Sequence, residues 1–303
     1  MSQLVRWICG ALIALAGVSA LAAPAQANLS AAEIVSKNVA ARGGLQAWRA
    51  VKTMSLTGKM GAGGNQRQAL QIPTQGQATV ISAKTEQAEL PSRRVEEVYL
   101  PFLMDLARPR KMHFELDFNG QKALQVYDGV KGWKLRPYLN RLEVEPYTAD
   151  EAKIAATQAD LDGPLIDYAA KGTQVALDGT EKVEGRDTYK LKLTQKSGDV
   201  SYVWVDAQTF LETKVSGQPR RLDGTDHPVE VYYRDYRNVS GLQIPFLLET
   251  HVDPVAKTAT GLRDTPVPPE KTVIEKVVIN PEFDAGVFAK PTASAAMLAP
   301  KKN

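Results

Sequence analysis

Residues 111–118 read Lys-Met-His-Phe-Glu-Leu-Asp-Phe, and this stretch decides the fold class. Met112, Phe114, Leu116 and Phe118 are apolar and alternate with polar or charged residues. Side chains that alternate with a period of two point to opposite faces of a strand. We therefore expect a strand with one buried and one solvated face, which is typical of antiparallel sheets.

The same alternation recurs along most of the chain. After Val51, the residues Met54, Leu56 and Met60 alternate with polar residues, and residues 188–194 repeat the pattern. Further strands are predicted at 78–83, 93–100, 124–127, 132–136, 174–177, 200–206, 210–215, 229–236, 244–252 and 272–279. So many strands predict one large antiparallel sheet that must curl over something.

Dipeptides typical of tight hairpin turns separate many of these runs: Asn119-Gly120, Asp128-Gly129, Asp178-Gly179, Glu184-Gly185, Ser197-Gly198 and Ser240-Gly241. Glycine at such positions supplies the positive φ that these turns require. Three segments look irregular instead: the glycine-rich 61–68, the apolar 99–106 with its Pro101, and the proline-rich 253–270. We interpret 99–106 as a core segment or as a lip inserted into a cavity.

Two helix starts are marked by capping boxes, a Ser or Thr followed three residues later by Glu. Ser30 with Glu33 opens a first helix, and Thr148 with Glu151 opens an alanine-rich one that interrupts the strands. A further short helix is expected over 162–168, where Asp-Gly-Pro precedes apolar residues. Small residues pack weakly, so residues 148–168 could form a movable cover.

The first 27 residues have the zones of an export signal. A basic residue, Arg6, precedes an apolar run over 7–21 and a small-residue site at 25–27. That order predicts a cleavable signal peptide at 1–27, although the apolar run could instead be a retained membrane anchor. We expect a folded domain over 28–290 and a disordered tail over 291–303.

Removing the signal would remove Cys9, the chain's only cysteine, and would leave a net charge of +2 from 36 basic and 34 acidic residues. A disulfide framework and a thiolate site are thereby excluded for the mature chain. A charge balance this even argues against nucleic acid as a partner.

A search for catalytic chemistry is mostly negative. The sequence has no Gly-x-Ser-x-Gly elbow, and its 3 histidines lack the spacing of metal ligands. Asp160 with Asp162, or Glu96 with Glu97, could form an acid/base pair, but solvated charge is the simpler interpretation. We therefore predict that the chain is not an enzyme and needs no cofactor or metal.

An ordered set of motifs resembles the periplasmic lipoprotein-carrier superfamily typified by LolA and LolB, in its broad outer-membrane lipoprotein-sorting branch. The matching segments cover nearly all of the mature chain: Ala41-Arg42-Gly43-Gly44 with Ala47-Trp48 and Val51-Lys52-Thr53, Arg108-Pro109-Arg110-Lys111, Val126-Tyr127-Asp128-Gly129 with Gly132-Trp133, residues 159–165, Val205-Asp206-Ala207-Gln208-Thr209-Phe210-Leu211, Tyr233-Arg234-Asp235-Tyr236 with residues 241–245, and Asn280-Pro281 with Phe288.

The resemblance implies a mostly β (α+β) fold, in which one strongly curved antiparallel sheet forms an open half-barrel and helices cover an apolar cavity. It also implies a periplasmic carrier that binds the acyl chains of a lipoprotein or another lipid and shuttles it towards the outer membrane. Partners would then be transient donor and acceptor membrane proteins, and the carrier would be a monomer. The chain is longer than the best-studied carriers and lacks the anchoring cysteine of the LolB type.

The residues expected to line the cavity are apolar or aromatic and share strand faces: Met54, Leu56, Met112, Phe114, Leu116, Phe118, Trp133 and Trp204. The alternative is that they simply pack beneath the helices. Two other functions stay open. One is a lipid-sensing module of the same fold, and the other is an exported carbohydrate-binding protein or hydrolase with a groove lined by Trp133 and Trp204.

Overall fold

The computed structural model describes residues 29–64, 97–222, 225–253, 269–284 and 286–298. It contains one antiparallel sheet of 13 strands, in the order β6 (Arg141–Pro146), β5 (Gly132–Arg136), β4 (Gln121–Tyr127), β3 (Lys111–Phe118), β2 (Glu97–Ala107), β1 (Thr53–Gly64), β15 (Glu270–Ile279), β14 (Leu242–Val252), β13 (Val229–Val239), β10 (Glu212–Ser216), β9 (Val200–Asp206), β8 (Arg186–Thr194) and β7 (Gln174–Val183).

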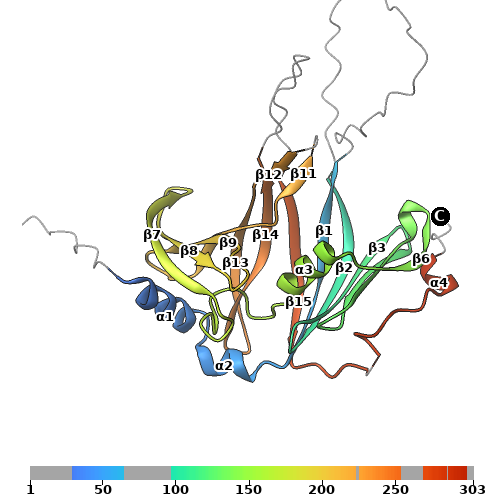
Figure 1. The fold of residues 1–303 in the computed structure, drawn as a ribbon, viewed down its shortest axis with the longest axis horizontal. Coiled ribbons are helices and arrows are strands. Elements are labelled where there is room, and N and C mark those ends of the chain that lie inside the picture. The colour runs from blue at the N-terminus through green and yellow to red at the C-terminus, as the bar shows by residue number, and fades with distance from the viewer. Residues whose placement is uncertain (1–28, 65–96, 223–224, 254–268, 285, 299–303) are drawn as a thin grey trace, which may run out of the picture.

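The sheet is strongly curved and does not close. Figure 1 shows its two edge strands, β6 and β7, on opposite sides of the molecule. A separate hairpin consists of β11 (Arg220–Leu222) and β12 (Thr225–His227). The helices are α1 (Ala31–Ala41), α2 (Leu45–Ala50), α3 (Ala149–Gln158) and α4 (Ala295–Leu298), with a 3₁₀ turn η1 (Pro137–Leu139). The predicted mostly β fold with an open, curved antiparallel sheet is confirmed.

One face of the sheet carries the core, and we call it the inner face. Met112 on β3 pairs with Leu106 on β2, and Leu106 pairs with Met54 on β1, so these side chains share that face. A first buried cluster joins them to α2 and α3, and a second joins Ile34 of α1 to Leu191 and other residues of β8 and β9. The inner face therefore packs against helices on both halves of the sheet, which we call its two arms: one contains β1 to β6 and the other β7 to β10.

Both predicted capping boxes are present. The Ser30 hydroxyl accepts from the Glu33 backbone N–H at 3.3 Å, and the Glu33 carboxylate accepts from the Ser30 backbone N–H at 2.8 Å. Thr148 and Glu151 make the same reciprocal pair at 3.2 and 2.9 Å. These bonds satisfy backbone donors that the first turn leaves free, which fixes where each helix begins.

The helix expected over 162–168 does not form, so that prediction is wrong. Residues 162–172 make successive turns, and Asp167 has φ of 52°, outside the helical region. Arg49 holds the Asp167 carboxylate through two hydrogen bonds, at 2.9 and 2.6 Å. A contact with the distant helix α2 thus accompanies a backbone that local sequence did not predict.

Three other predictions differ from the structure. Residues 99–106 form most of the regular strand β2, where Pro101 pairs with Lys59 of β1 and stands just outside the β2–β3 pairs, which begin at Phe102. Asp178-Gly179 lies within β7 at a shift of register, instead of at a hairpin turn. The tail expected to be disordered includes α4, which packs against β4.

Several predictions fall outside the described residues: the signal peptide at 1–27, the strand at 78–83, residues 93–96, residues 65–68 of the irregular segment 61–68, and residues 254–268 of the segment 253–270. Residues 61–64 were predicted to belong to a loop but form the end of β1. Among the described helices, none combines the length and the apolar character needed to cross a membrane.

Candidate functional site

Helix α3 bridges the two arms of the curved sheet. Glu151 forms an ion pair with Lys134 on β5, and Lys153 pairs at 2.9 Å with Asp199 in the turn between β8 and β9. β5 and β9 stand near opposite ends of the strand order. The side chains of Lys153 and Asp199 are 64% and 44% exposed, so water screens this second pair strongly.

The packing of α3 on the inner face is light. Its contacts with the first core cluster come from Ala152, Ala155 and Ala156, and Ile154 is 37% exposed. Alanine removes little apolar surface from water when it is buried. We infer that α3 is held mainly by its two ion pairs and a few small side chains.

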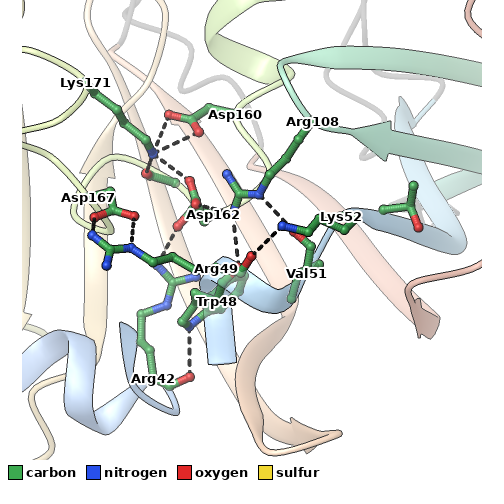
Figure 2. A network of polar contacts seen from close by, with 12 residues as sticks. Arg42, Trp48, Arg49, Val51, Lys52, Arg108, Asp160, Asp162, Asp167 and Lys171 are labelled. Carbon is green, nitrogen blue, oxygen red and sulfur yellow. Dashed lines mark hydrogen bonds and ion pairs between the residues drawn. The ribbon is translucent and has the colours of Figure 1, made fainter. Parts of the chain in front are cut away.

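The segment that follows α3 is anchored firmly, as Figure 2 shows. Asp162 is 1% exposed, and its carboxylate accepts from Arg108 Nη2 at 2.5 Å and from Lys171 Nζ at 2.6 Å. Arg42 Nη1 donates to the Asp162 backbone oxygen at 3.0 Å. The prediction that Asp162 is a solvated surface charge is wrong, because Arg42 and Arg108 from distant segments and the nearby Lys171 enclose it.

Lys171 also binds Asp160 and so couples two carboxylates. Its Nζ lies 2.9 Å from Asp160 Oδ1 and donates to the Gly163 carbonyl at 2.6 Å. Burial raises the pKa of Asp160 to about 6, although the charge of Lys171 acts against this shift. Burial acts in the same direction on the Asp162 carboxyl, but its bonds with Lys171 and Arg108 outweigh burial and hold that pKa below its ordinary value.

Arg42 connects this anchor to the sheet. Its Nη1 also pairs with Glu212 at 3.1 Å, its guanidinium lies 4.4 Å from the ring centre of Trp48, and its carbonyl accepts from the Trp48 indole at 3.0 Å. The Glu212 carboxylate further accepts from the Tyr236 hydroxyl at 3.2 Å, and burial together with this carboxylate raises the pKa of Tyr236 well above its ordinary value. Helices α1 and α2 are thus fixed to the fold by buried polar bonds.

A cavity of about 290 Å³ lies between α3 and strands β3 to β5. Its walls combine apolar and polar side chains: Phe114, Leu116, Ala123, Leu124, Gln125, Lys134, Leu135, Arg136, Tyr138, Tyr147, Glu151, Ile154, Ala155 and Gln158. The resemblance implied an apolar cavity, whereas this one has an ion pair in its wall. A volume of this size is at the lower end of the range for small-molecule sites.

Tyr147 is seated over Gly132 on β5. A Cβ added at Gly132 would lie 1.8 Å from the Tyr147 ring, so the ring occupies space that only glycine leaves open. The Tyr147 hydroxyl is buried and has no hydrogen-bond partner among the described residues. Burial and the charge of Glu151 both raise its pKa well above the ordinary value for tyrosine, so the hydroxyl keeps its proton.

The eight residues predicted to line a cavity divide into groups. Phe114 and Leu116 line the cavity described above. Met54 and Met112 are buried in the first core cluster, and Leu56 packs against it. These three side chains are not among those that line the cavity, whereas Phe114 and Leu116 line it and also take part in the packing of the same cluster.

The remaining three predicted residues lie elsewhere. Phe118 packs on Tyr138, with ring centres 5.3 Å apart. Trp133 pairs with Val126, whereas its neighbour Lys134 pairs with Gln125 and faces the cavity, so Trp133 occupies the outer face of β5. Trp204 also lies on the outer face, because it pairs with Lys190 while the adjacent Val203 belongs to the core.

Trp204 is held in an ordered polar setting on that outer face. Its indole donates to Glu181 at 2.9 Å, and Lys214 Nζ lies 3.9 Å from its ring centre. Because β5 and β9 stand near opposite ends of the strand order, Trp133 and Trp204 do not form one groove. The carbohydrate-binding interpretation therefore loses the groove on which it was based.

Residues that sequence reasoning missed form the polar wall of the cavity. Lys134 and Arg136 fall on the inner face of β5, and Glu151 and Tyr147 come from the start of α3 and the residues before it. The capping box explained Glu151 by itself, so nothing local indicated its pairing with Lys134. The Gly132–Tyr147 contact joins residues brought together by pairing of β5 with β6.

No protein-family model and no curated protein matches this sequence. Solved structures do resemble it. A DUF1329 family protein from Desulfovibrio piger aligns with a TM-score of 0.50 at 12% identity over 85% of this chain and 96% of its own. A LolA superfamily protein from Nitrosomonas europaea aligns at 0.48 and 12%, over 86% and 98%. An outer membrane lipoprotein-sorting domain from Vibrio parahaemolyticus aligns at 0.47 and 11%, over 85% and 95%.

Identities this low concern the fold alone, and the comparison of folds rests on the alignment with the DUF1329 family protein. The other two proteins carry the names that the sequence resemblance predicted. The alignment with the DUF1329 family protein shows a likeness of fold, and the open, curved sheet that the resemblance implied is present in this chain.

Proposed function

We propose that this chain is a periplasmic, non-catalytic carrier of an acyl lipid, which it holds beneath α3. The observation that carries the proposal is the cavity between the inner face and a lightly attached helix. Phe114 and Leu116 supply an apolar wall, and α3 supplies a cover that can leave without disturbing the anchored segment behind it.

The energetics are compatible with reversible carriage. Each buried methylene contributes about 0.8 kcal/mol, so a chain of about ten carbons would contribute roughly 8 kcal/mol before the costs of association. Opening α3 requires loss of one strongly exposed ion pair, one less exposed pair and the contacts of small side chains. Loading and release can therefore proceed at a modest energetic cost.

Export supports the same proposal. Residues 1–27 have the order of zones typical of a secretory signal, which would deliver the chain to the periplasm. There it would take lipid from a membrane donor and pass it towards the outer membrane as a monomer. A lipid-sensing role would use the same cavity and would differ in handing a signal, instead of cargo, to its membrane partner.

The test is native mass spectrometry and lipid extraction on the mature protein, purified from the periplasm without detergent. A carrier is expected to retain acyl lipid at near-stoichiometric amounts and to pass it to acceptor vesicles. Protein that arrives empty and takes up no added fatty acid, phospholipid or lipoprotein contradicts the proposal. Lipid that binds but never reaches vesicles, with or without a membrane extract, favours the sensing role.

A further inference from the structure

The walls of the cavity differ in chemistry from one side to the other. Phe114, Leu116 and Ala123 on β3 and β4 form an apolar side together with Ile154 of α3. Along β5 the wall changes to charged side chains. A ligand that matches both sides has an apolar chain and a polar head, and the polar groups of the wall decide which head fits.

Two buried groups of the polar side that can donate hydrogen bonds have no partner among the described residues. Arg136 Nη2 donates to Glu145 at 2.6 Å, but Arg136 Nε is buried without a hydrogen-bond partner in the described part of the chain. The Tyr147 hydroxyl is in the same condition. Buried donors are costly to leave unpaired, so both positions favour a ligand atom that accepts hydrogen bonds.

The charges around these donors favour an anion over a cation. Glu151 is neutralised by Lys134, and Glu145 is shared between Arg136 and the exposed Arg141, which lies 3.3 Å away. These five side chains leave one positive charge in excess near the polar side. A carboxylate head would gain from this charge, whereas an ammonium head could neither accept hydrogen bonds nor gain from it.

With α3 in the position seen here, the cavity has room for one apolar chain. A group the size of a water molecule takes about 30 Å³ of liquid volume, so the cavity of about 290 Å³ holds roughly ten such groups. Three long acyl chains of a lipoprotein exceed this capacity several-fold. One medium-length chain fits it.

We propose that the cavity takes a single-chain amphiphile of about ten carbons, whose anionic head accepts hydrogen bonds from Arg136 and Tyr147. This inference rests on the proposed function, since it names the class of lipid held beneath α3. It is narrower than what the resemblance implies, which is a lipoprotein or another lipid as the cargo.

The test is isothermal titration of the delipidated mature protein with decanoate, decanol and decylammonium, three ligands that share a chain and differ in the head. Decanoate is expected to bind about tenfold or more tightly than decylammonium, with decanol between them. Tyr147→Phe is expected to weaken decanoate binding about tenfold and to change the affinity for decanol by no more than about threefold. The substitution removes only the hydroxyl, which is proposed to donate to the anionic head. Tyr202→Phe on the outer face is the matched control and should change neither affinity.

Leu116→Trp provides a second variant, because its larger side chain should fill the apolar side and abolish decanoate binding. Its folding is checked by thermal unfolding followed by circular dichroism. Equal affinity for the three heads, or equal decanoate affinity in Tyr147→Phe and Tyr202→Phe, overturns the proposed head recognition. Uptake of phosphatidylglycerol vesicle lipid but not of decanoate overturns the single-chain class while leaving the carrier function intact. Binding of none of these lipids overturns both.

Discussion

Replacing Asp162 with asparagine is expected to lower the free energy of unfolding by about 2–4 kcal/mol, because the substitution removes a buried charge that two cations share. Removing one partner of a buried ion pair costs about 3–5 kcal/mol when the remaining charge stays buried. Here Asp162 is 1% exposed and Lys171 15%, but the Arg108 side chain is 32% exposed and can regain some water. The expected loss is therefore below the upper end of that range.

The matched comparison is Lys153→Ala, which breaks the exposed pair between α3 and Asp199. Because both side chains of that pair are largely in water, its loss should cost at most about 1 kcal/mol. Urea unfolding at pH 7.5, followed by circular dichroism, measures both values. At about 2–4 °C per kcal/mol for a chain of this size, Asp162→Asn should also lower the Tm by roughly 4–16 °C.

Equal losses for the two variants, or a loss below about 1 kcal/mol for Asp162→Asn, would refute the division into an anchored segment and a lightly held helix. That division is what allows α3 to open while residues 159–171 remain in place. The comparison thus examines the physical basis of the proposed cover independently of any ligand.

Three further predictions concern the same region. Asp160→Asn should stabilise the protein relative to the wild type by about 1–3 kcal/mol at pH 7.5 and much less at pH 4. The folded-state pKa of Asp160 is about 6, above the ordinary 3.8, so the ionised carboxylate becomes unfavourable in the folded state as the pH rises through 6. Urea unfolding at several pH values checks this, and a gain independent of pH would contradict it. Gly132→Ala should displace the Tyr147 ring, lower the free energy of unfolding by about 1–3 kcal/mol and weaken decanoate binding at least as much as Tyr147→Phe does. Unchanged stability and affinity would show that the position of the Tyr147 ring does not depend on glycine at 132. Glu151→Gln keeps a residue suited to the capping box but loses the ion pair with Lys134. The transfer of a fluorescent fatty acid to vesicles, followed by stopped flow, should therefore be at least threefold faster. An unchanged rate would count against α3 as the cover.

Much of the fold could be predicted from the sequence because its strands alternate cleanly. The stretch 111–118 is β3 as predicted, and 132–136 and 200–206 match β5 and β9 at both ends. Capping boxes located α1 and α3 because their bonds are local. Local chemistry was misleading at 162–168, where a long-range contact of Asp167 with Arg49 accompanies a non-helical backbone.

The candidate site was predictable only in part. Phe114 and Leu116 could be assigned to the inner face because they alternate within a long strand, but the faces of Trp133 and Trp204 depend on how β5 and β9 pair with their neighbours. Such pairing is a property of the assembled sheet, and a shift of one residue exchanges the faces. The polar wall and the Asp162 anchor join residues from distant segments, which no local pattern marks.

The most direct test of the central claim places a photoreactive side chain within the cavity. p-Benzoylphenylalanine in place of Phe114 should, on irradiation in cells, form a covalent adduct with an acyl lipid, identifiable by mass spectrometry of the purified protein. The same side chain in place of Tyr202, on the outer face, should form none. An acyl adduct at 114 and not at 202 is the predicted result, whereas adducts at both positions alike, only at 202, or at neither would contradict the claim that lipid is held beneath α3.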